Sequence, residues 1–150
     1  MCSRVLIADD PELMRPGIKS LLKDRDDISV IGEASNLPAT IQKTAEVLPD
    51  VLIIDLHMTG RENGDLKLLT IGPPFVVISF DISEIVKEQA RRLGAVKFID
   101  KMDLANELVP MLLQHAPHSK LSEYCWHQRR ICFPVAPTPE RNMRNRSRSF

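Results

Sequence analysis

The stretch VLIIDLHM, residues 51–58, reads as a buried strand that ends in a carboxylate, Asp55. Three β-branched residues and a leucine, in one continuous apolar run, favour a strand that is covered on both faces. A charge at the end of such a strand needs a partner or a chemical task, because an unpaired buried charge is strongly unfavourable. We therefore expect the partners of Asp55 to come from other strand ends.

Four further runs have the character of strands: Arg4–Ala8, Ile28–Ala34, Phe75–Ser79 and Val96–Ile99. Apolar residues at helical spacing predict helices within residues 13–22, 41–48 and 82–93. Residues 65–71 allow only a short helix, and Asp103 is a plausible N-cap for a last helix to about Leu113, which Pro110 should kink or shorten. The order β-α, five times over, predicts an α/β fold with a doubly wound, five-stranded parallel sheet and helices on both faces.

Composition and charge divide the chain near Gln114. Residues 1–114 hold 13 Lys and Arg against 18 Asp and Glu, whereas residues 115–150 hold 7 against 2. We expect a domain over 1–114, then a disordered basic tail with several prolines over 115–150. Apolar residues make up 43% of the chain, but no run approaches the roughly 20 residues that span a bilayer. We therefore expect a cytoplasmic protein that does not associate with membranes.

The tail offers two weak functional motifs. Cys125, His127 and Cys132 suggest zinc, but their spacing matches no common site, and an odd count of three cysteines argues against a disulfide framework. Residues 141–150, RNMRNRSRSF, are rich enough in arginine for phosphate contacts with nucleic acid. Incidental thiols and a flexible tail without a dedicated partner are the preferred interpretations of the two motifs.

Polar residues gather where the predicted strands end. Asp9 and Asp10 close the first strand, Asp55 the third and Ser79 the fourth, and Lys101 follows the fifth. Because carboxyl ends of parallel strands meet at one edge of a sheet, we expect these side chains to lie together. Three carboxylates repel each other in a partly dry cleft, and a divalent cation resolves that conflict. All-oxygen ligands suit Mg²⁺.

This set of groups also indicates a chemistry. A carboxylate can act as a nucleophile toward phosphorus and form an aspartyl phosphate. The charge on the transferred group is then met by Mg²⁺, an ammonium group and a hydroxyl. Asp55, Ser79 and Lys101 supply one group of each protein type that is needed.

Four stretches resemble the signature of a known family. RVLIADD (4–10), PDVLIIDLHM (49–58), FVVIS (75–79) and GAVKFIDK (94–101) look like those of the response-regulator receiver domain of two-component signalling. The resemblance covers about residues 3–114. It implies a flavodoxin-like sheet of order 2-1-3-4-5, and transfer of a phosphoryl group from a histidine kinase or phosphotransfer protein to one aspartate with Mg²⁺.

The resemblance also implies a role for single residues. Asp55 would be the phospho-acceptor, Asp10 a direct metal ligand, Asp9 the holder of a metal-bound water, and the backbone carbonyl of His57 a further ligand. Ser79 would be the switch hydroxyl, Lys101 the lysine that contacts the phosphoryl group, and Phe98 the aromatic switch residue.

Taken alone, each of these residues has a simpler interpretation. The acid pair at Asp9 fits a helix cap, Asp55 a turn, Ser79 a hydrogen bond to its own backbone, and Lys101 a solvated charge. Phe98 fits a core position whatever else it does. The simpler interpretations hold together only if four coincidences occur at neighbouring strand ends. We therefore prefer the interpretation that all of these residues form one receiver site.

Several positions depart from the family pattern. The bulky Phe80 follows Ser79 where a small residue is usual, which predicts narrowed access to Asp55. The third helix is clipped, Thr59 and Met102 stand where proline is frequent, and Pro110 lies in the last helix. The wording is closest to receivers of helix-turn-helix regulators, but the 36 residues after Gln114 are too few for that output domain. We expect a stand-alone receiver or a remnant, without DNA binding and with a homodimer left open.

The preferred function is a phospho-acceptor signalling module that, once phosphorylated, changes the surface formed by its fourth helix, fifth strand and fifth helix. It is not an enzyme beyond its own phosphorylation and dephosphorylation. One alternative is a degenerate receiver that binds a partner independently of phosphorylation. The other is a phosphohydrolase of the haloacid-dehalogenase type, against which His57 stands in place of a second aspartate.

Overall fold

The predicted strands pair into one parallel sheet of order β2-β1-β3-β4-β5. A computed structural model describes residues 2–10, 14–58 and 66–115. The strands are β1 (Ser3–Ala8), β2 (Ile28–Ala34), β3 (Val51–Asp55), β4 (Phe75–Ser79) and β5 (Lys97–Asp100). The helices are α1 (Met14–Leu22), α2 (Leu37–Val47), α3 (Glu84–Arg92) and α4 (Leu104–Gln114), with 3-10 turns η2 (Leu66–Ile71) and η3 (Lys101–Asp103). The predicted fold class and strand order are confirmed.

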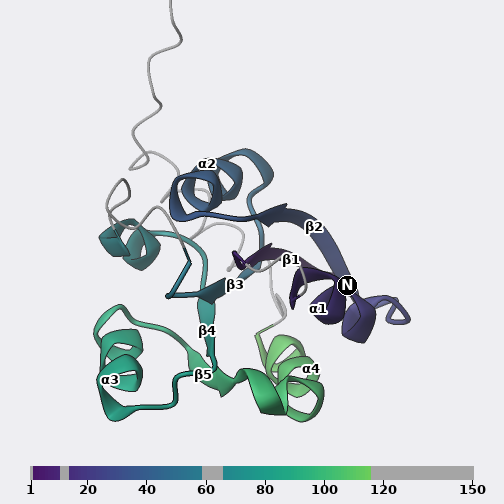
Figure 1. Ribbon diagram of the computed structural model, residues 1–150. Helices are drawn as coiled ribbons and strands as arrows, with labels where there is room; N and C mark the ends of the chain where they lie inside the picture. Colours follow the sequence, from purple (N-terminus) through teal and green to yellow (C-terminus); the bar gives the residue numbers. More distant parts are fainter. Residues whose placement is uncertain (1, 11–13, 59–65, 116–150) are drawn as a thin grey trace, which may run out of the picture.

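Alternate residues of each strand supply two separate cores. Val5 and Ile7 of β1 face the core beneath α1 and α4, whereas Leu6 and Ala8 face the core beneath α2, η2 and α3. Figure 1 shows α1 and α4 on one side of the sheet and α2 and α3 on the other. Burial on both faces is what the continuous apolar runs require, and it fixes all strand ends at one edge.

The last helix begins where it was predicted to begin, at Leu104, but without the expected side-chain cap. Asp103 stands at the N-cap position of α4, but its side chain makes no cap hydrogen bond. Asp100 caps the preceding turn instead, by accepting a hydrogen bond from the Met102 N–H. The prediction of Asp103 as a capping side chain is therefore wrong, because a 3-10 turn intervenes between β5 and α4.

Pro110 does not shorten α4, which continues to Gln114. The interior proline costs about 3 kcal/mol through its lost hydrogen bond and ring clash. Buried Leu108, Met111 and Leu112 hold the helix on the sheet and offset that cost. None of the helices in the described part of the chain is long and apolar enough to cross a membrane.

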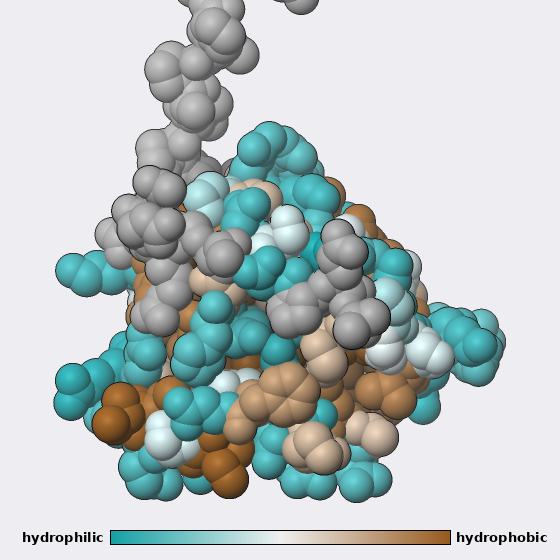
Figure 2. Space-filling view, viewed as in Figure 1, coloured by the Kyte–Doolittle hydropathy of each residue, from teal (hydrophilic) through white to brown (hydrophobic). Residues whose placement is uncertain are grey.

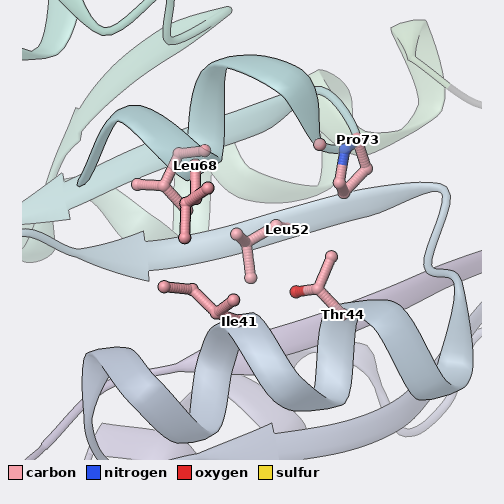
Figure 3. A pocket seen from close by; sticks show the side chains of 7 residues that line it. Ile41, Thr44, Leu52, Leu68 and Pro73 are labelled. Atoms are coloured by element: carbon pink, nitrogen blue, oxygen red, sulfur yellow. The ribbon is translucent and has the colours of Figure 1, made fainter. Parts of the chain in front are cut away.

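The predicted clipped helix is confirmed as the 3-10 turn η2. It ends where Gly72, Pro73 and Pro74 lead into β4. A small apolar hollow lies between η2 and α2 (Figure 3), lined by Ile41, Thr44, Leu52, Leu68, Leu69, Gly72 and Pro73. Such a short turn therefore leaves the sheet less completely covered here than a full helix would.

One glycine is required by backbone geometry. Gly94 follows the end of α3 with a φ of +81°, in the left-handed region that residues with a Cβ rarely adopt. We expect Gly94→Ala to lower the free energy of unfolding by about 1–2 kcal/mol in urea titrations. Gly17→Ala is the matched control: its Cβ would meet open space within α1, so a gain of about 0.5–1 kcal/mol is expected. Equal effects of the two substitutions would contradict this assignment.

Candidate functional site

Lys101 joins two carboxylates at the carboxyl edge of the sheet. Its Nζ lies 2.6 Å from Oδ2 of Asp55 and 2.8 Å from Oδ2 of Asp9. The three side chains come from the ends of β3 and β1 and from the turn after β5. The lysine side chain is only 1% exposed. A lysine buried to this degree needs paired charge, and the two acids provide it.

Asp9 is an acid under electrostatic strain. Burial raises the pKa of its carboxyl above the usual value, and the hydrogen bond and charge of Lys101 oppose this only in part. Asp55 repels it as well. Among the described residues, Oδ1 of Asp9 has no hydrogen-bond partner, although it is buried. That oxygen faces a site where a cation or a water would lower its energy.

The strands β3 and β4 both end in a side chain that caps the following turn. Oδ1 of Asp55 accepts the His57 N–H at 2.8 Å, and Oγ of Ser79 accepts the Asp81 N–H at 3.0 Å. The simpler interpretations of Asp55 as a turn residue and of Ser79 as a partner of its own backbone are thus realised. The same bonds fix the direction of both side chains toward the site.

The side chain of His57 was not among the predicted site groups, which included only its backbone carbonyl. Its Nδ1 lies 3.3 Å from Oγ of Ser79 and 3.6 Å from Oδ1 of Asp55. The imidazole therefore stands between the predicted acceptor and the predicted switch hydroxyl. The sequence held one signal for this. His57 follows Asp55 by two positions, so it lies in the turn that begins at Asp55 and stays near its carboxylate.

The ring of Phe80 lies over the lysine, whereas its bulk predicted only narrowed access to Asp55. The Nζ of Lys101 is 5.1 Å from the ring centroid, within the range of a cation–π contact, and Phe80 is 60% exposed. The ring therefore shields one side of the site from solvent.

Two more predicted residues come from β5 and from the position after Asp9. Phe98 is half-buried and packs against the core beneath α2 and α3. Asp10 is half-buried directly after Asp9. Within residues 2–10, 14–58 and 66–115, no three acid, histidine or cysteine side chains are grouped as a metal site. Lys101 lies between two of the three predicted carboxylates, those of Asp9 and Asp55.

The residues nevertheless fit Mg²⁺. Magnesium is typically held by one or two carboxylates together with waters, rather than by an all-protein cage. Asp9 offers a buried oxygen without a partner, and Asp55 lies across the lysine from it. The donors are oxygens throughout, which is the chemistry that a hard cation selects.

A doubly wound parallel sheet with acid and lysine side chains at its carboxyl edge defines the class of α/β proteins that place their ligand site there. The chain belongs to the response regulator receiver domain family, whose pattern it matches over residues 5–113. Receiver domains are phospho-acceptor signalling modules of two-component systems, and they generally bind Mg²⁺ at an acidic pocket. The family resemblance seen in the four sequence stretches is confirmed.

Relatives and solved structures agree with this assignment. The chain is 42% identical over 109 residues to the transcriptional regulatory protein LiaR of Bacillus subtilis, covering 70% of this chain and 52% of LiaR. It is 33% identical over 105 residues to a protein-glutamate methylesterase/protein-glutamine glutaminase of Methanococcoides burtonii, covering 65% of this chain and 29% of the relative. The chain thus spans about a third to a half of the length of these curated relatives.

Among solved structures, the receiver domain of the putative response regulator NarL from Mycobacterium tuberculosis is similar, with a TM-score of 0.69 and 27% identity. The match covers 79% of this chain and 98% of that domain. The response regulator domain of Thermotoga maritima CheB gives a TM-score of 0.68 at 26% identity. The match covers 77% of this chain and 96% of that domain.

Proposed function

We propose that this chain receives a phosphoryl group on Asp55 from a histidine kinase or phosphotransfer protein, in a reaction that depends on Mg²⁺. The observation that carries the proposal is the Lys101 bridge, which places an ammonium group against both Asp9 and Asp55. Such a buried acid–lysine–acid set is costly for stability, so a chemical role explains its presence better than a structural one.

Each residue contributes a separate task to the transfer. A carboxylate oxygen of Asp55 attacks phosphorus, the bond to the donor's leaving group breaks, and the donor departs with that electron pair. Lys101 and the hydroxyl of Ser79 bind the oxygens of the transferred group. Asp9, Asp10, Asp55 and the carbonyl of His57 would hold Mg²⁺, which supplies charge neutralisation when bound.

The switch that follows involves the surface of α3, β5 and α4. Ser79 turns toward the phosphoryl group, Phe98 turns inward, and the two packed states of this surface change in population. Apolar side chains gather on this side of the molecule, over α3 and its neighbours (Figure 2). They include Phe80, Ile82, Ile85 and Met102, all exposed. A downstream partner or a second copy of the chain has apolar surface to bind there.

Intact-mass spectrometry tests the transfer. The chain is incubated with Mg²⁺ and either a phosphorylated histidine phosphotransfer domain or acetyl phosphate. A gain of one phosphoryl group is expected, absent in Asp55→Asn and after chelation of the metal. No gain with either donor, or a gain that survives Asp55→Asn, would refute the proposed function.

Phe80→Ala is expected to accelerate phosphorylation by acetyl phosphate roughly tenfold, because it uncovers Lys101. Removing a steric obstacle worth about 1.4 kcal/mol changes a rate by that factor. The time course of intact mass is the measurement. Ile82→Ala changes another exposed apolar residue in the same loop, and as the control it should leave the rate unchanged. Equal rates for Phe80→Ala and the unmodified chain would show that the ring is not an obstacle.

A phosphorylation-independent binding module remains the second candidate. It is favoured by the Phe80 ring over Lys101 and by the absence of three grouped metal-ligating side chains in the described residues. Partner binding that ignores Mg²⁺, phosphodonor and Asp55→Ala would establish it. The phosphohydrolase alternative loses support, because residues 5–113 match the response regulator receiver domain.

A further inference from the structure

The hydroxyl of Ser79 is already engaged on two sides. Its Oγ accepts the Asp81 N–H at 3.0 Å and lies 3.3 Å from Nδ1 of His57. A hydroxyl has one proton and two lone pairs, so these two contacts use most of its hydrogen-bonding capacity. The switch group is thus held in place before any phosphoryl group arrives.

The imidazole contacts the hydroxyl that a phosphoryl group on Asp55 would bind. Nδ1 of His57 lies between Ser79 Oγ and Asp55 Oδ1, at 3.3 and 3.6 Å. An oxygen bound to the Ser79 hydroxyl would lie about 2.7 Å from Oγ, closer than Nδ1 itself. The Ser79 hydroxyl therefore has to leave its contact with Nδ1 in order to turn toward a phosphoryl oxygen.

The imidazole is free to leave. Its side chain is 47% exposed, so an outward rotation meets solvent. The backbone of His57 stays fixed meanwhile, because its N–H is bound to Oδ1 of Asp55. Whichever atom carries the proton of the Ser79–His57 hydrogen bond, that bond ends when the hydroxyl turns to a phosphoryl oxygen.

We propose that the His57 side chain is a positioning residue that holds Ser79 in the unphosphorylated domain, and that its hydrogen bond to Ser79 must break before a phosphoryl group can bind both Asp55 and Ser79. This inference rests on the proposed function. It assigns to the side chain a restraint on activation, separate from the role of its backbone carbonyl.

Binding of beryllofluoride, an unreactive phosphoryl mimic, tests the restraint by isothermal titration calorimetry with Mg²⁺. Loss of one hydrogen bond that competes with the ligand should tighten binding roughly three- to tenfold in His57→Ala. His57→Phe keeps the bulk of a ring but not the hydrogen bond, and it should tighten binding as well. His115→Ala, the same change at the end of α4, is the control and should match the unmodified chain.

The Ser79→Ala background shows whether His57 acts through Ser79. There, His57→Ala should change the beryllofluoride affinity little, because the restrained hydroxyl is gone. Three results would overturn the positioning role. The first is equal tightening in both backgrounds, and the second is unchanged or weaker binding in His57→Ala. The third is tightening in His57→Ala but not in His57→Phe. If neither the unmodified chain nor any variant binds beryllofluoride, the proposed function itself is contradicted.

Discussion

Lys101→Met is expected to reduce the rate of Asp55 phosphorylation by at least 100-fold. The substitution removes the ammonium group that lies 2.6 Å from Asp55, and loss of one preorganised donor costs about 10²–10³ in rate. The side chain keeps nearly the same length, so packing changes little. Time courses of intact mass with acetyl phosphate and Mg²⁺ give the rate.

The same substitution should lower the free energy of unfolding by about 3 kcal/mol at neutral pH, since it leaves two carboxylates buried without their cation. The pKa of Asp9, already raised by burial, rises further in the folded state. A carboxyl whose pKa is higher in the folded state than in the unfolded state destabilises the fold when the pH is high enough to ionise it. The lost stability therefore returns as the pH falls. Urea titrations at neutral and mildly acidic pH measure this recovery.

Lys97→Met provides the control for both effects. Lys97 is on β5, just before the turn that holds Lys101, and it is part of an exposed ion pair with Glu107. Such a pair contributes at most about 1 kcal/mol, so a small loss of stability and a normal phosphorylation rate are expected. Similar behaviour of the two lysine variants would mean that the bridge between Asp9 and Asp55 has no special role.

Asp9→Asn is expected to abolish the stabilisation of the domain by Mg²⁺. In the unmodified chain, Mg²⁺ at 100 times its dissociation constant should add about 2.7 kcal/mol to the free energy of unfolding. The variant lacks the anionic oxygen that we assign to the metal site. Without Mg²⁺ the variant should be at least as stable as the unmodified chain, because a buried carboxyl with a raised pKa has been removed.

Thermal unfolding with and without Mg²⁺ measures both parts of this prediction. Asp26→Asn makes the same change at an exposed position between α1 and β2, and it should leave the Mg²⁺ effect intact. If Mg²⁺ stabilises Asp9→Asn as much as the unmodified chain, the metal does not bind at Asp9.

The strands were the most predictable part of the fold. Continuous apolar runs gave the bounds of β3 and β4, whose residues are all buried. The bounds of β2 were also predicted, although this edge strand contains Ser29 and Glu33 and is only partly buried. The start of α3 was less predictable. Ile82 and Ile85 share helical spacing with Val86, yet both are exposed, and Asp81 binds the Ser83 N–H in a loop before the helix. Periodicity alone does not tell a buried face from an exposed apolar patch.

The site was predictable in its membership but not in its contacts. Strand-end residues had to meet at one edge, and Asp9, Asp55, Ser79 and Lys101 do so. That Lys101 would pair with both acids depends on a buried side-chain geometry that spacing does not encode. The place of the His57 ring depends in the same way on the direction of a turn. The predicted boundary at Gln114 and the tail motifs lie at and beyond the edge of the described residues.

Locating the phosphoryl group on one side chain tests the account most directly. Borohydride reduces an aspartyl phosphate to homoserine, and peptide mass spectrometry then identifies the modified residue. After phosphorylation with Mg²⁺, homoserine is expected at position 55 and at no other aspartate. Homoserine at another aspartate, with Asp55 unmodified, would contradict the claim that Asp9, Ser79 and Lys101 are assembled around Asp55 as the acceptor.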